Sequence, residues 1–527
     1  MKPTAIALIV VLVSALISAM YLRKYGKKVD DYYLMGRNAP GWVVGAATMA
    51  SWGTLFTWVG AVGFSLQFGG LIIFLIAGSA WGMLYLCVYL GRLLRRGEYR
   101  TLSSYFEERY STRVSHIAAL VLSVGTIFYL FPQFTGMGAV LLKTLGIPFF
   151  WSIVIFSIFM LVFVFMGGMA SAIMFGAGMF IIMLASCILY PIGLHLVTGT
   201  PIGEMVATTA QSVGTQYWTP FGMTNAVSKF TVGYWVVTSG SWFAIAMSSG
   251  HIISLSLACK SERELVKGYG IILPLALFCI AVYYVMSPGV ETLIPRGSMK
   301  TDFVAPHLYA NLFPPWIGVI QIVGVVAAGL STVGAMFVFI ATNLTQSIVK
   351  LFNLDSADLS VLKVTKVVIV FLGILCIPLG YYMPAGVMVI ATGFMGAFLL
   401  SCIFLPLAIG SSWGRVTEKA IMIHMSINLV ICLFMVITNV SLGWFAPHPL
   451  IWLIPISIVS FIGLTLMFAP TDQDMTNWNN FYAKCHSIAG GMATLEKGPV
   501  KDSILPLVGI FVGIGSIVFF LAFLHGW

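Results

Sequence analysis

Fourteen stretches of this chain are long and apolar enough to cross a lipid bilayer, and no other feature limits the fold as strongly. A crossing helix needs about 20 mostly apolar residues. The composition agrees, since 59% of the residues are hydrophobic, 8% are charged and the mean hydropathy is +0.99. The sequence therefore predicts an all-α membrane protein with about 14 transmembrane helices, at residues 4–22, 41–63, 71–94, 114–141, 150–171, 174–198, 232–256, 268–288, 315–349, 367–382, 386–410, 420–438, 450–468 and 504–524.

The positive charges are divided unequally between the loops. If the N-terminus lies outside, 22 of the 27 Lys and Arg residues fall on the inner side. They lie in residues 23–37, 92–113, 260–267, 350–366, 415–419 and 484–501, and only Lys2, Lys143, Lys229, Arg296 and Lys300 remain outside. This positive-inside pattern predicts an integral protein of the cytoplasmic membrane with both termini outside. It also accounts for the net charge of +10 without a nucleic-acid partner. Because Arg23 and Lys24 follow the first segment, we expect that segment to be a retained span rather than a cleaved signal.

The sequence lacks the usual motifs for nucleotide hydrolysis, for redox or metal chemistry and for a proton relay. No GxxxxGK[ST] phosphate loop is present, and the eight cysteines form no CxxC pair. The loops are too short to bury a soluble domain. All 17 Asp and Glu residues fall in loops or at the edges of spans, which leaves no carboxylate for a proton relay in mid-membrane. We expect neither an enzyme nor an organic cofactor, and function must be sought in neutral polar groups.

Two spans carry small and hydroxyl residues near their middle, where a helix can unwind. The second span has Gly53 and Thr54, and the seventh has Ser239, Gly240 and Ser241. Unwound backbone can present amides and carbonyls to a ligand or ion. Close packing between helices is the alternative explanation for either span alone. Because five spans separate the two, their repetition favours a transporter built from inverted repeats.

The sequence resembles the sodium:solute symporter family in five motifs that occur in register from about residue 30 to 350. They are DDYYLMGRNAPGW at 30–42, MASWGTLFTWVGAVG at 49–63, YRTLSSYFEERYSTR at 99–113, GHIISLSLACKSERE at 250–264 and AAGLSTVGA at 327–335. The resemblance implies the leucine-transporter-type fold, with two inverted five-helix repeats and broken first helices. Its parts would be an extra helix at 1–29, repeats at 30–198 and 199–410, and further helices at 411–527.

The resemblance also implies a sodium site between the broken second span and the ninth span. Its ligands would be the backbone carbonyls of Ala50, Gly53 and Ala328 and the side chains of Ser331 and Thr332. Oxygen atoms suit Na⁺ because it is a hard cation. The alternative for both hydroxyls is a bond to the carbonyl one turn earlier in their own helix.

At several positions the sequence departs from the family pattern, and these departures bear on the number of coupling ions and on the solute. Many members carry a Thr-Asp pair where this chain has Phe175 and Gly176, so we expect a single coupling ion. Proline-type members have Asp at the position of Trp52, and sugar-type members have Gln at that of Thr57. Neither substrate is favoured. His251 is either a gating or pH-sensing residue or a hydrogen-bonded structural one.

By position, the substrate should lie among residues of the second, fourth and seventh spans. The expected lining is Trp52, Phe56, Thr57, Tyr129, Gln133, Ser239, Ser241 and Trp242. Aromatic walls favour an amine or a quaternary ammonium group. A carboxylate is also compatible, because helix N-termini offer partial positive charge. The alternative is that these aromatic residues fill the core.

These features together predict a sodium-coupled secondary active symporter that imports a small organic solute, an amine, amino acid or carboxylate, by alternating access. A proton-coupled transporter of the same fold is one alternative, and a transporter-like nutrient sensor that binds without transport is another. The expected partners are the solute and the lipid bilayer. The sequence leaves the oligomeric state open, a monomer included.

Overall fold

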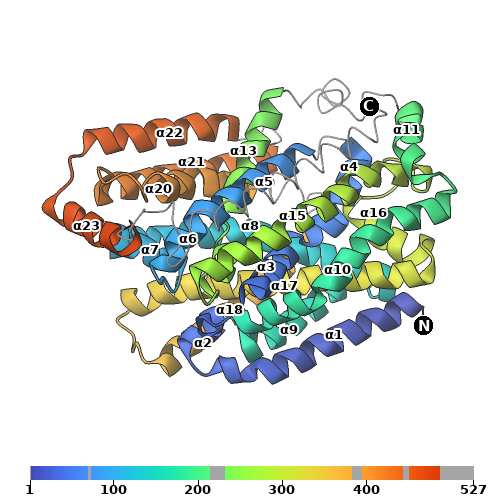
Figure 1. Cartoon of the computed structure of the whole chain (residues 1–527), viewed down its shortest axis with the longest axis horizontal. Coiled ribbons are helices and arrows are strands. Elements are labelled where there is room, and N and C mark those ends of the chain that lie inside the picture. The colour runs from blue at the N-terminus through green and yellow to red at the C-terminus, as the bar shows by residue number, and fades with distance from the viewer. Residues whose placement is uncertain (1, 69–72, 214–231, 383–393, 443–449, 487–527) are drawn as a thin grey trace.

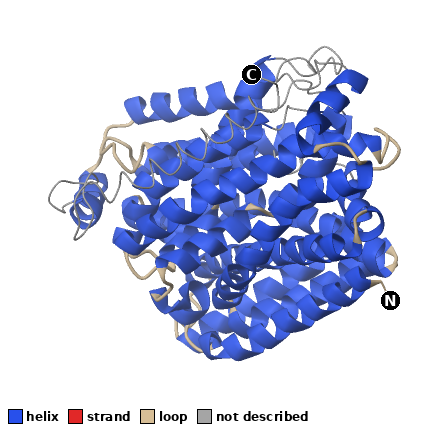
Figure 2. Cartoon of the chain, turned by 45° about the vertical axis from the view of Figure 1, so that its right-hand side comes forward, coloured by secondary structure: helices blue, strands red, loops and turns tan. Residues whose placement is uncertain are grey.

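The computed structural model of the chain describes residues 2–68, 73–213, 232–382, 394–442 and 450–486. These residues form helices and the loops between them, and the described part contains no strand apart from one isolated bridge between Ala39 and Cys259 (Figure 2). The predicted all-α class is therefore confirmed for the described residues. The expected last span, 504–524, lies outside them.

The first half of the chain runs through the helices expected for the first six spans (Figure 1). They are α1 (Pro3–Tyr21), η1 (Leu22–Gly26), α2 (Val29–Leu34), η2 (Met35–Arg37), α3 (Gly41–Trp52), η3 (Phe56–Gly60), α4 (Ala61–Phe68), α5 (Ile73–Tyr85), η5 (Leu86–Leu90), α6 (Gly91–Arg96), α7 (Leu102–Arg109), α8 (Thr112–Leu145), α9 (Phe149–Gly167), α10 (Met169–Thr198) and α11 (Ile202–Val213).

The second half of the chain also consists of apolar helices with short connections. Its elements are α13 (Val232–Ser248), α14 (Gly250–Leu257), α15 (Glu262–Met286), η7 (Ser287–Thr292), α16 (Thr301–His307), η8 (Leu308–Leu312), α17 (Pro315–Leu351), α18 (Asp358–Tyr382), η9 (Leu399–Phe404), α20 (Leu405–Ala408), α21 (Glu418–Leu442), α22 (Leu450–Met467) and α23 (Asp472–His486). Residues 394–408 together form one short apolar helix.

Seven of the described helices are long and apolar enough to cross a membrane unaided, and α22 with α23 forms a further pair bent by 115°. Two of the other expected spans are divided by breaks, between α3 and η3 with α4 and between α13 and α14, while the expected span 268–288 forms the 25-residue helix α15. The structure thus supports a protein with several membrane helices, and the count of 14 remains a prediction.

Local signals set the ends of the longest helices. The Ser111 hydroxyl accepts a hydrogen bond from the Val114 amide at the start of α8, and Ser261 does the same for Glu264 at the start of α15. Gly146 and Gly199, both in the left-handed conformation, end α8 and α10. These caps hold each helix to the register in which its buried residues face the core.

Helix α17 lies at the centre of the bundle. In its most apolar segment, 94% of the residues are buried, and it packs against α1, α3, α8, α10 and α18. Several of its neighbours present apolar residues to the outside; Ile17 of α1 is 62% exposed and Phe371 of α18 is 61% exposed. An apolar outer surface around a buried central helix is the arrangement expected in lipid.

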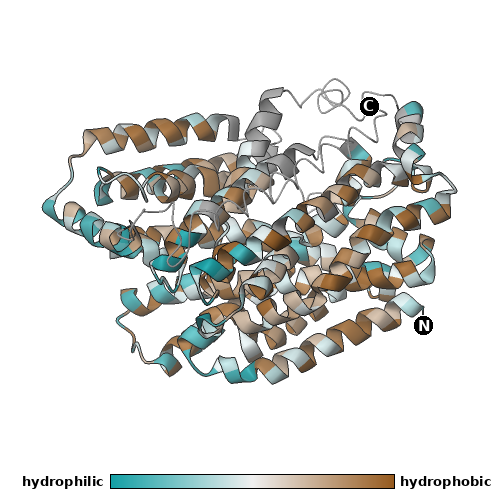
Figure 3. Ribbon diagram, in the orientation of Figure 1, coloured by the Kyte–Doolittle hydropathy of each residue, from teal (hydrophilic) through white to brown (hydrophobic). Residues whose placement is uncertain are grey.

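The basic loops gather at one end of the molecule, which we call the basic end and define by residues 23–37, 92–113, 260–267, 350–366 and 415–419 (Figures 1 and 3). Arg100 pairs with Asp30 at 2.8 Å there, and the Ala39 amide donates to the Ala258 carbonyl at 3.1 Å. The N-terminus and α11 lie at the other end (Figure 1). This separation fits the positive-inside pattern, and the direction of insertion remains a prediction.

Candidate functional site

The second expected span is broken where the sequence predicts it, at Gly53 and Thr54. Helix α3 ends at Trp52, and Gly53 leaves the helical region with a ψ of 76°. A Cβ on Gly53 would lie 2.3 Å from the Trp58 ring, so only glycine allows this packing. The Thr54 hydroxyl accepts a hydrogen bond from the Phe56 amide at 3.0 Å and so begins the next helical segment. The Leu55 amide donates to Gln133 Oε1 of α8 at 3.1 Å.

The seventh expected span breaks at a different place from the one predicted. Backbone hydrogen bonding continues through Ser239, Gly240 and Ser241 to Ser248, and the break falls at Ser249, whose ψ of 110° separates α13 from α14. The Phe339 ring of α17 packs beside this break, and only glycine fits at position 250, since a Cβ there would lie 1.7 Å from the ring. The expectation of unwinding at 239–241 is therefore wrong. Ser241 directs its hydroxyl at Gly396, where a Cβ would lie 1.8 Å from the Oγ atom, so the two helices pack closely there. The role of Ser241 in solute binding stays a prediction.

Four of the five expected sodium ligands meet at the last turn of α3. The Ser331 hydroxyl donates to the carbonyls of Ala50 and Ala328, both at 3.1 Å. The Thr332 hydroxyl lies 3.2 Å from the Ser51 carbonyl and 3.5 Å from that of Ala50. Thr332 thus contacts α3 and makes no bond to the carbonyl one turn earlier in α17. No contact joins the Gly53 carbonyl to these hydroxyls in the described structure, and the Ser51 carbonyl takes that place.

The chemistry of this cluster fits a small hard cation. Ser331 and Thr332 are fully buried, and the carbonyls of Ala50 and Ser51 belong to the C-terminal end of α3, where the helix dipole is negative. The described residues hold no group of three or more His, Cys, Asp or Glu side chains that would suit a transition metal. Gly176 of α10 closes the other side, since a Cβ there would lie 3.1 Å from Ser331 Cβ and 3.2 Å from Ala50 Cβ.

Most of the expected substrate residues surround the same break. Tyr129 donates its hydroxyl hydrogen to Thr54 Oγ1 at 3.2 Å, and Gln133 holds the Leu55 amide. The rings of Phe56 and Trp242 lie 4.7 Å apart, which joins η3 to α13. Trp52 and Thr57 are buried at the two sides of the break. Ser239 belongs to α13, and its side chain is outside the described part of the chain.

At the second break, sequence reasoning missed Ser249 and left the role of His251 open. The Ser249 hydroxyl is fully buried and has no hydrogen-bond partner among the described residues. The His251 ring is equally buried, 5.9 Å from the Tyr129 ring, and neither of its nitrogens makes a hydrogen bond of good geometry to a described group. The three small residues Ser248, Ser249 and Gly250 were the available signal for this break.

Comparison with protein families decides the identity. The model of the sodium:solute symporter family matches residues 32–428. The chain belongs to the sodium:solute symporter family. This symporter is 24% identical over 471 residues to the sodium/pantothenate symporter of Escherichia coli (strain K12), covering 87% of this chain and 94% of that protein. It is 23% identical over 482 residues to the sodium/glucose cotransporter of Vibrio parahaemolyticus, covering 83% of this chain and 85% of that one.

Solved structures support the fold of the symporter. A substrate-bound, outward-open sodium-coupled sialic acid symporter superposes with a TM-score of 0.69 at 18% identity, over 90% of this chain and 99% of that one. A nucleobase-cation-symport-1 family transporter in a closed conformation superposes with a TM-score of 0.53 at 16% identity, over 85% and 98%. Both have the leucine-transporter-type fold.

Family membership establishes the general activity. The symporter is an integral membrane protein that couples sodium to the transport of a small solute, and it is not an enzyme. The two relatives are named for different solutes, pantothenate and glucose, so family membership leaves the solute of this chain open.

Proposed function

We propose that this symporter imports a small organic solute that carries a carboxylate, an amino acid included, driven by Na⁺ entry through alternating access. The observation that carries the proposal is the start of α14. Its first amides have no partner within the helix, and the Ser249 hydroxyl stands beside them, buried and without a hydrogen-bond partner among the described residues, next to the buried His251 ring. A helix N-terminus with free amides favours an anionic group.

Sodium would occupy the space between α3 and α17. There the Ser331 and Thr332 hydroxyls would turn their lone pairs toward the ion, beside the carbonyls of Ala50, Ser51 and Ala328. The ion site and the solute site would share α3, since α14 packs against both α3 and α17. Binding at one site would thereby organise the other, as coupling requires. We propose residues 30–198 and 199–410 as the two inverted repeats and a cytoplasmic membrane location with both termini outside.

An amine is the second candidate and rests on the aromatic side chains. Phe56 and Trp242 form a ring pair at the first break, and Trp52 closes the last turn of α3. No Asp or Glu lies in the spans that form the two breaks to neutralise an ammonium group, so an aromatic face would have to serve. An amino acid would use both features, with its carboxylate at α14 and its ammonium group over Trp52.

Reconstitution in liposomes tests the mode of coupling. A metabolite library screened by thermal shift, with and without Na⁺, first supplies the solute, because a ligand of the folded state raises the apparent stability. Uptake of that solute under a Na⁺ gradient is the expected result. Uptake under a pH gradient alone would establish proton coupling, and binding without uptake under either gradient would establish a sensor.

A pair of neighbouring serines tests the class of solute. Ser249→Ala should weaken binding of a carboxylate solute by about 10- to 100-fold, the usual effect of losing a hydrogen bond to a charged group. Ser248→Ala is the matched control, because that hydroxyl already donates to the Ala244 carbonyl in its own helix. Equal affinity for the solute and for its amide, in which the carboxylate is neutral, would contradict the proposal.

A further inference from the structure

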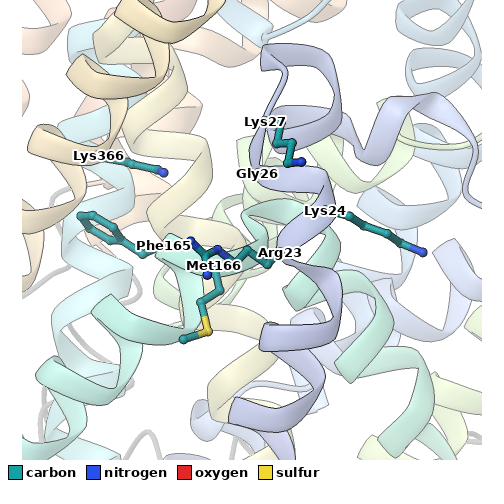
Figure 4. A pocket seen from close by; sticks show the side chains of 7 residues that line it. All are labelled: Arg23, Lys24, Gly26, Lys27, Phe165, Met166 and Lys366. Carbon is teal, nitrogen blue, oxygen red and sulfur yellow. The ribbon is translucent and has the colours of Figure 1, made fainter.

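A cavity of about 570 Å³ lies at the basic end, and Figure 4 shows the residues that line it. It is formed by η1 after α1, by the end of α9 and by the first half of α18. Gly26 brings η1 close to α9, since a Cβ there would lie 2.9 Å from the Met166 carbonyl oxygen. The cavity therefore joins the N-terminal helix to two helices of the bundle.

Positive charge dominates the lining of this cavity. Arg23, Lys24, Lys27 and Lys366 all contribute, no acidic residue does, and none of the four forms an ion pair with a described residue. Figure 4 shows Arg23 extending toward Phe165 and Met166, with Lys366 on their far side, while Lys24 points away. The carbonyl end of α9 supplies only about half a negative charge. The cavity thus keeps an excess of positive charge that calls for an anion.

The surroundings of the cavity are those of a membrane interface. Lys366 lies over the Phe165 ring at 5.7 Å and Lys24 over the Tyr21 ring at 4.9 Å, and aromatic residues with basic neighbours are typical of the headgroup level. Apolar side chains lead away from it along the outer surface. Met20 of α1 is 60% exposed, Ile158 of α9 57% and Val367 of α18 68%.

We propose that this cavity binds the phosphate group of an anionic phospholipid of the leaflet at the basic end, with the acyl chains lying along α1, α9 and α18. Arg23 offers a paired donor geometry that suits phosphate oxygens, and Lys27 and Lys366 add point charges on either side. Basic pockets between membrane helices are recognised sites for such headgroups. A lipid bound here ties the N-terminal helix to the bundle and stabilises their contact.

Lipid binding is measured on the purified full-length chain in detergent by native mass spectrometry and thermal shift. The chain should retain dioleoyl phosphatidylglycerol in preference to dioleoyl phosphatidylcholine, and only the former should raise the melting temperature. Arg23→Gln, Lys27→Gln and Lys366→Gln combined should weaken retention of the anionic lipid at least about tenfold. The control combines Arg113→Gln, Lys267→Gln and Lys363→Gln, which removes as many exposed charges from the basic end outside the cavity.

The outcomes separate the proposal from its alternatives. Equal weakening by both triple variants would overturn it, since a diffuse positive surface would then explain the preference. If inorganic phosphate displaces the anionic lipid when both are present at equal concentration, the cavity is a site for a soluble anion and the proposal fails. The triple variant could also melt earlier than the control without added lipid. The chain Lys27→Arg, Lys366→Arg then replaces it in the test, since it keeps Arg23 and every positive charge and should retain the anionic lipid as the natural sequence does.

Discussion

The Ser331 hydroxyl of α17 lies 3.1 Å from the Ala50 carbonyl of α3, although 281 residues separate the two along the chain. The contact joins the broken helix of the first proposed repeat to the central helix of the second. Without an ion, the hydroxyl hydrogen satisfies the carbonyl. When Na⁺ is bound, both groups can turn an oxygen lone pair toward it, so the same contact holds the helices together in either condition.

Removal of either hydroxyl should weaken sodium dependence. Ser331→Ala and Thr332→Ala each delete one oxygen ligand and leave an Ala50 or Ser51 carbonyl without its partner. We expect a several-fold increase in the Na⁺ concentration for half-maximal uptake, with normal amounts of protein in the membrane. Thr342→Ala is the control, since that hydroxyl bonds only within its own helix, to Phe339. An unchanged Na⁺ requirement in both variants would show that this cluster does not bind the coupling ion.

Replacement of Gly176 by alanine should disturb the sodium cluster, whereas the same replacement of Gly178 should not. A Cβ on Gly176 meets Ser331 and Ala50 at 3.1 and 3.2 Å, whereas a Cβ on Gly178 has nothing within 4 Å. Gly176→Ala should therefore push α10 away from the sodium cluster and raise the Na⁺ requirement, while Gly178→Ala transports normally. The two variants are compared by uptake at a series of Na⁺ concentrations. Similar behaviour of both would show that α10 does not define the site.

The series Trp, Phe, Leu at residue 52 separates an ammonium from other solutes. If the solute carries an ammonium group over this ring, Trp52→Leu should weaken binding by about 1–2 kcal/mol, or about 5- to 30-fold in Kd. Sodium binding without solute should change little, because oxygen atoms hold the ion. A graded fall along the series supports the ring as a cation site. Loss only at Leu indicates shape filling, and no change at either places Trp52 outside the solute site.

Glu262 should be essential for stability at the basic end. Its carboxylate pairs with Arg92 at 2.5 Å and Arg96 at 2.6 Å, and all three side chains are at least 97% buried. Glu262→Gln removes the negative charge that faces two buried guanidinium groups, for which the expected loss is about 3–5 kcal/mol. A clearly lower melting temperature in detergent is expected, and Glu98→Gln, at a side chain 72% exposed, is the control. Equal melting of both variants would contradict this role.

Local sequence was sufficient to predict the helical spans, the basic end and the first break. Each depends on neighbours in the chain: runs of apolar residues set the spans, and Gly53 with Thr54 interrupts one of them. The adjacent hydroxyls Ser331 and Thr332 were also recognisable, because an apolar helix has few reasons to carry two of them.

Only tertiary packing decided the second break and the partners of these hydroxyls. Small residues at 239–241 and at 248–250 look alike in the sequence, but the Phe339 ring of α17 fills the space beside Gly250, whereas Gly396 accommodates Ser241 within an unbroken helix. Packing between α17 and α3 likewise brings the Thr332 hydroxyl to the Ser51 carbonyl, inside α3, and not to Gly53, which has already left the helix. A sequence shows which residues permit a break, and the neighbouring helices determine which of them are used.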